Sequence, residues 1–170
     1  MFVSNSMVKK VITIDKEASV FDAYDKMTAN KIRHLPVVDD GNKLVGIVTD
    51  RDLRSAMPFN LFKGSIEDED KKKIEQLKVK DIMTPDPITI SPMYTIQDAL
   101  LMIQREKVGA FPVVDSDGTL TGILSVRDLL RAFVNVLGIN EPGTLVGILV
   151  EEKIGQLKKI VDAITEEHIS

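Results

Sequence analysis

An internal duplication constrains the fold of this chain more than any other feature of its sequence. Shifting the 170-residue sequence against itself by about 76 positions aligns residues 3–54 with residues 79–130 without a gap, and about a third of the paired residues are identical. The matched blocks include Ile12-Thr13-Ile14 with Ile88-Thr89-Ile90, Pro36-Val37-Val38-Asp39 with Pro112-Val113-Val114-Asp115, and Arg51-Asp52-Leu53 with Arg127-Asp128-Leu129. Two copies of one structural unit therefore account for most of the chain.

The first half of each copy predicts a strand followed by a helix. In the first copy, the β-branched run at residues 11–14 favours a short strand. Ser19 and Thr95 are each followed three residues later by an aspartate, a pattern typical of helix N-caps. Apolar residues then recur at helical spacing in both copies, so an amphipathic helix is expected after each cap.

The second half of each copy predicts a hairpin and a closing helix. Residues 35–38 and 44–48 are strand-like runs that flank the turn sequence Asp40-Gly41-Asn42, and the second copy repeats the arrangement around Asp117-Gly118. A helix is expected to follow each hairpin, beginning near Thr49 and Ser125, and the second of these helices is predicted to end at Gly138.

The duplication predicts the fold class and the domain organisation. One copy exposes more apolar surface than it can cover, so two βαββα repeats are expected to pack face to face as one α+β body with pseudo-twofold symmetry and clefts between them. The predicted boundaries are 1–57 for the first repeat, 58–78 for a charged connector, 79–137 for the second repeat and 138–170 for a C-terminal arm. In the arm, residues 144–150 favour a strand, and a helical stripe follows at Leu157, Ile160, Val161 and Ile164.

Composition excludes several classes of function. The chain has no cysteine, which excludes disulfides, thiolate metal sites and cysteine nucleophiles. Its net charge of -4 argues against a nucleic acid partner. The apolar run at 145–150 is far too short to span a bilayer, and the first six residues lack the pattern of a signal peptide. A cytoplasmic protein without a membrane contact is expected.

Both copies contain the same strand-to-helix corner, Gly-Ile-x-[Thr/Ser]-x-Arg-Asp, at residues 46–52 and 122–128. A hydroxyl at the first turn of a helix, beside free N–H groups and the positive end of the helix dipole, suits a phosphate group. Arg51 and Arg127 add positive charge, and a carboxylate accepts hydrogen bonds from the two hydroxyls of a ribose. The same residues are also a helix-capping pattern, so a purely structural role remains open.

The repeated order of Ile-Thr-Ile, a helix, His-Leu-Pro-Val-Val-Asp and Leu-Val-Gly-Ile-Val-Thr-Asp-Arg-Asp-Leu resembles a tandem of cystathionine-beta-synthase-type (CBS) domains, a Bateman module, over roughly residues 1–137. The resemblance implies a sensor, usually a homodimer, that binds AMP, ADP, ATP, S-adenosylmethionine or another adenosyl ligand between the two domains. By position, Thr49 and Ser125 would contact phosphate, and Asp52 and Asp128 the ribose. Thr13 and Thr89, with Ile12 and Ile88, would border the adenine, and Pro36-Val37 and Pro112-Val113 would form the other wall of each base pocket.

The two copies differ in charged residues at positions that could interact with a phosphate group. Arg33 and His34 of the first copy correspond to Gly109 and Ala110 of the second. The supply of positive charge is therefore uneven, and the two sites are not expected to prefer the same number of phosphates. Arg33 and His34 are ligand candidates, but the sequence leaves open which of the two sites they face.

The C-terminal arm resembles the start of an ACT-type ligand-binding domain, which follows a CBS pair in acetoin-utilisation-type proteins. The resemblance begins at Asn140-Glu141-Pro142-Gly143-Thr144 and lacks the later strands and helix of that domain. An arm used for docking or dimerisation is therefore expected, without an amino-acid site.

Three classes of function compete. Catalysis has little support, because the sequence has no phosphate-binding Gly-rich loop, no metalloprotease motif and no nucleophile elbow. Neither a cofactor nor a metal site is expected, since the chain has only two histidines and no cysteine. A sensor of adenosine-containing molecules, acting on a regulated protein partner, is the preferred hypothesis, and a structural or dimerising module without a nucleotide ligand is the alternative.

Overall fold

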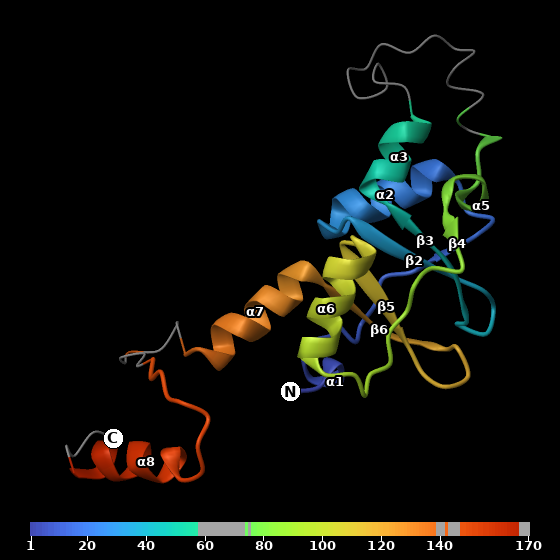
Figure 1. Ribbon diagram of the computed structural model, residues 1–170. Coiled ribbons are helices and arrows are strands. Elements are labelled where there is room, and N and C mark those ends of the chain that lie inside the picture. The colour runs from blue at the N-terminus through green and yellow to red at the C-terminus, as the bar shows by residue number, and fades with distance from the viewer. Residues whose placement is uncertain (58–73, 75, 139–141, 143–146, 167–170) are drawn as a thin grey trace. The chain divides into compact units, whose positions relative to one another are not determined.

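The computed structural model describes residues 1–57, 74, 76–138, 142 and 147–166 (Figure 1). The chain divides into two compact units, Met1–Phe133 and Val134–Ser170. The first unit contains both repeats, and their elements follow the predicted order, so the expected α+β fold is confirmed. Of the predicted connector, residues 58–73 and 75 lie outside the described residues.

The first repeat forms a four-stranded sheet of order β1-β2-β3-β4. Its own elements are β1 (Ile14–Asp15), α2 (Val20–Asn30), β2 (His34–Val38), β3 (Leu44–Thr49) and α3 (Asp50–Ala56). The second repeat supplies α6 (Ile96–Glu106), β5 (Ala110–Val114), β6 (Leu120–Ser125) and α7 (Val126–Val136). The two hairpins have the same register, with Pro36 opposite Ile47 and Pro112 opposite Ile123.

The first predicted strand is shorter than expected in both repeats. Only Ile14 and Asp15 pair with β2, and in the second repeat only Ile90 pairs with Val113. The amide of Ile90 donates to the carbonyl of Pro112 at 3.1 Å, but the next bond toward Ile88 would need an amide N–H that Pro112 lacks. The proline therefore ends the parallel ladder and leaves the Ile-Thr segment irregular.

The repeats exchange their leading segments. The strand β4 (Thr84–Pro85), which precedes the second repeat in sequence, pairs with β3 of the first. Reciprocally, the amide of Val8 donates to the carbonyl of Ile123 at 2.9 Å. The short helices follow the same rule, because α1 (Val3–Ser6) lies beside β6 and α5 (Val79–Ile82) beside β3 (Figure 1). Each repeat is thus completed by residues that belong in sequence to the other.

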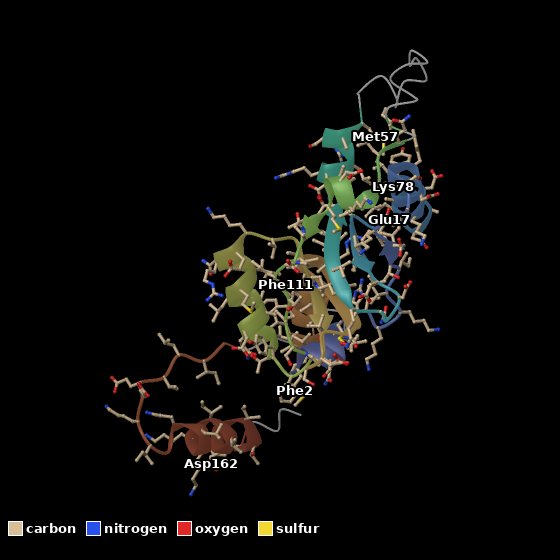
Figure 2. All side chains as sticks on the ribbon, turned by 90° about the vertical axis from the view of Figure 1, so that its right-hand side faces the viewer. Phe2, Glu17, Met57, Lys78, Phe111 and Asp162 are labelled. Carbon is tan, nitrogen blue, oxygen red and sulfur yellow. The ribbon has the colours of Figure 1, made fainter. Side chains whose placement is uncertain are left out.

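Each repeat has its own hydrophobic core, and each core includes a residue of an exchanged segment. Val79 is buried in the core of the first repeat, together with Ile74 from the end of the predicted connector. Val3 is buried in the core of the second, where Phe111 is fully enclosed by side chains (Figure 2). The exchange therefore contributes to the apolar burial of both halves, which ties their stabilities together.

Two equivalent glycines allow the exchanged segments to approach the sheets. A Cβ added to Gly122 would lie 2.5 Å from Sδ of Met7 and 3.2 Å from the carbonyl oxygen of Val8. A Cβ added to Gly46 would lie at the same distances from Sδ of Met83 and the carbonyl oxygen of Thr84. The methionine can move, but the backbone oxygen is held by the strand pairing, so no side chain fits without displacing the segment.

The second unit differs from the prediction in one element. The helix α8 (Gln156–Glu166) agrees with the predicted helical stripe. The predicted strand is wrong over residues 147–150, which are irregular and exposed, while 144–146 lie outside the described residues. A strand needs a neighbour for its backbone N–H and C=O groups, and the described part of this unit has none. No helix among the described residues is long and apolar enough to cross a membrane.

We expect Gly46→Ala and Gly122→Ala each to lower the free energy of unfolding by about 1–3 kcal/mol, because overpacking forces the exchanged segment away from the sheet. Chemical denaturation of the full chain measures the change. Gly147→Ala is the matched control, since an added Cβ there meets no atom within 4 Å, and its effect should stay within about 0.5 kcal/mol. Equal stabilities of all three variants would contradict the role assigned to the two glycines.

Candidate functional site

The two predicted strand-to-helix corners lie where β3 meets α3 and where β6 meets α7. In the first corner, the hydroxyl of Thr49 donates to Oδ2 of Asp52 at 2.6 Å and accepts from the Asp52 amide at 3.3 Å. The amide of Thr49 donates to the same Oδ2 at 2.8 Å. Ser125 and Asp128 form the same set in the second corner, with a hydroxyl-to-Oδ2 distance of 2.5 Å. Each corner is therefore a capping box.

The same capping box also occurs at the first helix of each repeat, where no ligand is expected. Ser19 and Asp22 cap α2, and Thr95 and Asp98 cap α6. These hydrogen bonds hold the pKa of Asp22 and of Asp98 below the ordinary value, because the ionised carboxylate is the better acceptor. The structural role that the sequence left open for the corners is thus real, and it uses only one oxygen of each aspartate.

The corners differ in what surrounds the second carboxylate oxygen. Asp128 is almost completely buried, and its Oδ1 lies 3.6 Å from Nη1 of Arg131. Asp52 is only partly buried, and the residue in its repeat that corresponds to Arg131 is Ser55. The carboxylate of the second corner therefore has a cationic neighbour that the first corner lacks.

One cavity of about 1150 Å³ in the first unit is lined by residues of both corners. From the first repeat, the predicted site residues that line it are Ile12, Arg33, His34, Thr49 and Arg51. From the second repeat, they are Ile88, Pro112, Ser125, Arg127 and Asp128. The structure thus brings together most of the residues that the sequence suggested, in a single continuous space.

The other predicted site residues lie outside the lining of this cavity. The side chains of Val37 and Val113 are fully buried in the two hydrophobic cores, because they lie on the core side of their strands. The remaining residues in this group are Thr13, Pro36, Asp52 and Thr89. The predicted symmetry between the two sites is accordingly incomplete, since Asp128 reaches the cavity and Asp52 does not.

His34 lies at the junction of the two repeats. A Cβ added to Gly109 would lie 2.7 Å from Nε2 of His34, so the glycine leaves room for the imidazole. Burial lowers the pKa of His34, and the nearby charge of Arg33 lowers it further, while Asp50 and Asp52 act in the opposite direction. The two repeats therefore differ here in charge, because Arg33 and His34 replace uncharged residues. They also differ in size, because Gly109 leaves the space that His34 occupies.

Several residues that line the cavity were not predicted. Lys31 and Lys107 occupy equivalent positions of the two repeats, at the C-cap of α2 and of α6, and both have left-handed backbone conformations with φ of 53° and 54°. The repeat alignment contains this signal, because the two lysines are identical at the offset of the duplication. The other charged residues missed are Lys10, Asp50, Arg54, Asp86 and Arg131.

Comparison with known proteins identifies the family. The sequence model of the CBS domain matches residues 3–58 and again residues 79–135. The chain is a tandem CBS-domain protein. The resemblance inferred from the repeated motifs is thus confirmed, and the exchanged segments fall within or beside the two matched regions.

Relatives of this CBS pair include stand-alone proteins and enzymes. A CBS domain-containing protein of Dictyostelium discoideum is 35% identical over 137 residues, which cover 81% of this chain and 94% of that protein. Inosine-5'-monophosphate dehydrogenase of Methanocaldococcus jannaschii is 35% identical over 125 residues, covering 74% of this chain but only 22% of the enzyme. The similarity to the enzyme is therefore confined to a small part of its length.

Solved structures similar to the CBS pair include the following three. CBSX2 of Arabidopsis thaliana, in complex with AMP, is 31% identical with a TM-score of 0.68 and covers 79% of this chain and 97% of its own. The CBS domain pair of protein MJ0100, in complex with 5-methylthioadenosine and S-adenosyl-L-methionine, is 25% identical with a TM-score of 0.66, covering 80% and 98%. A putative acetoin utilization protein, AcuB of Vibrio cholerae, is 27% identical with a TM-score of 0.68, covering 85% and 98%.

We predict that His34 titrates below pH 6.5, the ordinary pKa of histidine, so the CBS pair loses stability as the pH falls through that value. Above pH 6.5 the imidazole is neutral in both the folded and the unfolded chain, so protonation does not affect stability. Below pH 6.5 the unfolded chain binds a proton more readily than the folded chain, which favours unfolding. The loss is limited to about 1.4 kcal/mol per pH unit for one proton, and it should be absent in His34→Gln.

Titration of the His34 ring protons by NMR tests this prediction, with the signal assigned by its absence in His34→Gln. Gly109→Ala is expected to displace the imidazole and to move the pKa of His34 toward 6.5. A His34 that titrates at or above 6.5 in the unsubstituted protein would contradict the prediction.

Proposed function

We propose that this CBS pair is a regulatory module that binds an adenine nucleotide or a related adenosyl ligand in the cavity shared by its two repeats. The observation that carries the proposal is the convergence of both strand-to-helix corners on one cavity of about 1150 Å³. Related CBS pairs bind AMP in one structure and 5-methylthioadenosine with S-adenosyl-L-methionine in another. The module would act in the cytoplasm on a regulated protein partner.

The second corner offers the more complete set of ligand contacts. The positive end of the α7 dipole and the side chain of Arg127 suit a phosphate, whereas the Ser125 hydroxyl and the amides of Val126 and Asp128 are already hydrogen-bonded within the protein. Oδ1 of Asp128, which takes no part in the capping box, is the atom suited to a ribose hydroxyl. Ile88 is exposed and Pro112 buried, and both line the cavity where a flat apolar base would fit.

The proposal assigns no catalysis to this chain. The enzyme among its relatives shares only a small fraction of its length with the CBS pair. The hydroxyls of both corners and Oδ2 of Asp128 are already paired in capping boxes, and Asp50 is paired with Arg54. Binding, rather than bond making, is what these groups are arranged to do.

Asp128→Ala and Asp98→Ala separate ligand binding from helix capping. Both variants lose the carboxylate half of the same capping box and keep the N-cap hydroxyl, so each should lower the free energy of unfolding, by about 0.5–1.5 kcal/mol for the lost hydrogen bond. Only Asp128 lines the cavity, so only its replacement should weaken binding of an adenine nucleotide, by about 1.5–3 kcal/mol. Asp52→Ala should have a smaller effect on binding, because Asp52 lies outside the lining. Titration calorimetry with AMP and ATP measures the affinities.

Thermal unfolding tests the alternative of a module without a nucleotide ligand. A ligand at a hundredfold excess over its dissociation constant stabilises the folded state by about 2.7 kcal/mol. If none of AMP, ADP, ATP and S-adenosylmethionine raises the unfolding temperature, the structural or dimerising function replaces the proposed one. If the Asp128→Ala and Asp98→Ala variants bind the nucleotide equally well, the proposed ribose contact of Asp128 is wrong, although nucleotide binding itself would still stand.

We further propose that the module is a homodimer assembled through the helices of its second repeat. Leu101 of α6 and Leu130 and Phe133 of α7 are 66%, 60% and 54% exposed. The corresponding residues of the first repeat are Asp25, Arg54 and the buried Met57. One repeat is therefore polar on these helices and the other apolar, and an apolar face on one half of a pseudo-symmetric body suits an isologous contact with a second copy.

Leu130→Glu is expected to shift the full chain from dimer to monomer, because it places a charge in the proposed contact. Light scattering after size-exclusion chromatography measures the mass. Leu149→Glu makes the same substitution at a fully exposed leucine of the C-terminal arm and should leave the dimer intact. Conversion of Leu149→Glu, but not of Leu130→Glu, to a monomer would assign the contact to the arm and overturn the proposed face. A monomeric unsubstituted protein would refute the dimer.

A further inference from the structure

The cavity of the CBS pair is strongly basic, in contrast to the chain as a whole. Eight lysine and arginine side chains line it, against three aspartates, so its lining carries an excess of five positive charges. The complete chain has a net charge of -4. Positive charge is therefore concentrated in this one concave surface, where low-dielectric walls strengthen the attraction for an anion.

Most of these cations form no ion pair with a carboxylate in the part of the chain that the structure describes. Two of the three acids are engaged by residues of their own helices, Asp50 by Arg54 and Asp128 by Arg131. Among the described residues, no ion pair is formed by the other six basic residues of the lining, which are Lys10, Lys31, Arg33, Arg51, Lys107 and Arg127. Six unpaired like charges around one space repel one another, and a bound polyanion would relieve that repulsion.

The backbone holds some of these cations in place at a cost. Lys31 and Lys107 adopt the left-handed conformation, which glycine favours at a helix C-cap and other residues adopt with strain. Both repeats nevertheless have a lysine there, and both lysines line the cavity. Strained residues with charged side chains in a cavity point to a ligand rather than to stability.

The cations that line the cavity come from both repeats. Lys31 and Arg33 come from the loop after α2, and Lys107 from the equivalent loop after α6. Arg51 and Arg127 come from the two corners. The loops meet where His34 lies against Gly109, so cations of both repeats face one common space. A ligand with several phosphate groups is the kind that reaches cations of both repeats at once.

From this distribution of charge we infer that the cavity selects its ligand by negative charge and takes a nucleoside di- or triphosphate in preference to uncharged or cationic adenosyl compounds. The inference rests on the proposed function for the adenosine part of the ligand. It distinguishes this chain from the related pair of MJ0100, whose structure contains 5-methylthioadenosine and S-adenosyl-L-methionine. Neither of those molecules carries phosphate, and the second is a cation at its sulfonium.

Calorimetric titration of the full chain with ATP, AMP, adenosine and S-adenosylmethionine tests the inference, in magnesium-free buffer so that the nucleotides keep their charge. Affinity is expected to rise at least tenfold from AMP to ATP, with adenosine and S-adenosylmethionine the weakest. Raising the salt from 50 to 300 mM should reduce the advantage of ATP, because exposed charges are screened within about 10 Å at 0.1 M salt. An AMP affinity equal to that of ATP, or tightest binding of S-adenosylmethionine, overturns the inference.

Inorganic triphosphate keeps the two proposals distinguishable. If all four adenosyl compounds bind equally well, charge selection is wrong and the proposed adenosyl site stands. If triphosphate binds as tightly as ATP and adenosine does not bind, the adenosyl site is wrong and only an anion site remains. If nothing binds, both proposals fail.

The double variant Arg33→Gln with Lys107→Gln removes one unpaired cation from each loop. It is expected to weaken ATP at least tenfold and AMP by a smaller factor. Lys158→Gln, in the exposed helix α8, removes a positive charge away from the cavity and should leave both affinities unchanged. A double variant that remains folded by circular dichroism and weakens ATP and AMP by the same factor would contradict a polyphosphate contact with these two residues.

Discussion

The exchange of leading segments between the two repeats is the constraint on which the rest of the structure depends. Each sheet is completed by backbone from the other repeat, Val8 on one side and Thr84–Pro85 on the other. Each core also includes a valine of the exchanged segment, Val3 or Val79. Neither half can therefore reach its native packing alone, and the cavity exists because the two halves are held together. At Gly46 and Gly122 the exchanged segments approach so closely that a side chain would displace them.

Capping and ligand binding are compatible at the two corners because a carboxylate has two oxygens. Oδ2 of each aspartate is fully used by the helix cap, which fixes the position of the side chain without help from a ligand. At Asp128, Oδ1 lies toward Arg131 in a cavity that has room for a nucleoside. A side chain that is already fixed in the free protein loses little conformational freedom when a ligand binds. The helix cap at Asp128 therefore has a structural role and would also favour ligand binding.

The two repeats have kept one fold while their surfaces have diverged. His34 of the first repeat lies against Gly109 of the second, which leaves space for the imidazole. The first repeat places Asp25 and Arg54 at helix positions where the second exposes Leu101 and Leu130. The two copies of the duplicated unit therefore differ in charge inside the cavity and in polarity on their outer helices.

The sequence by itself determined the duplication, the order of elements, the capped helices and the two corners, because periodicity and capping are local and recur at a fixed offset. Of the sixteen site residues that it suggested, ten line the cavity. Only the tertiary structure decided that leading segments are exchanged, that Pro36 and Pro112 shorten the first strand, and that Val37 and Val113 serve the cores. It also decided that Asp128 reaches the cavity and Asp52 does not. These outcomes depend on tertiary contacts between segments that are far apart in the sequence, and the local spacing of residues does not specify which of those segments pack together.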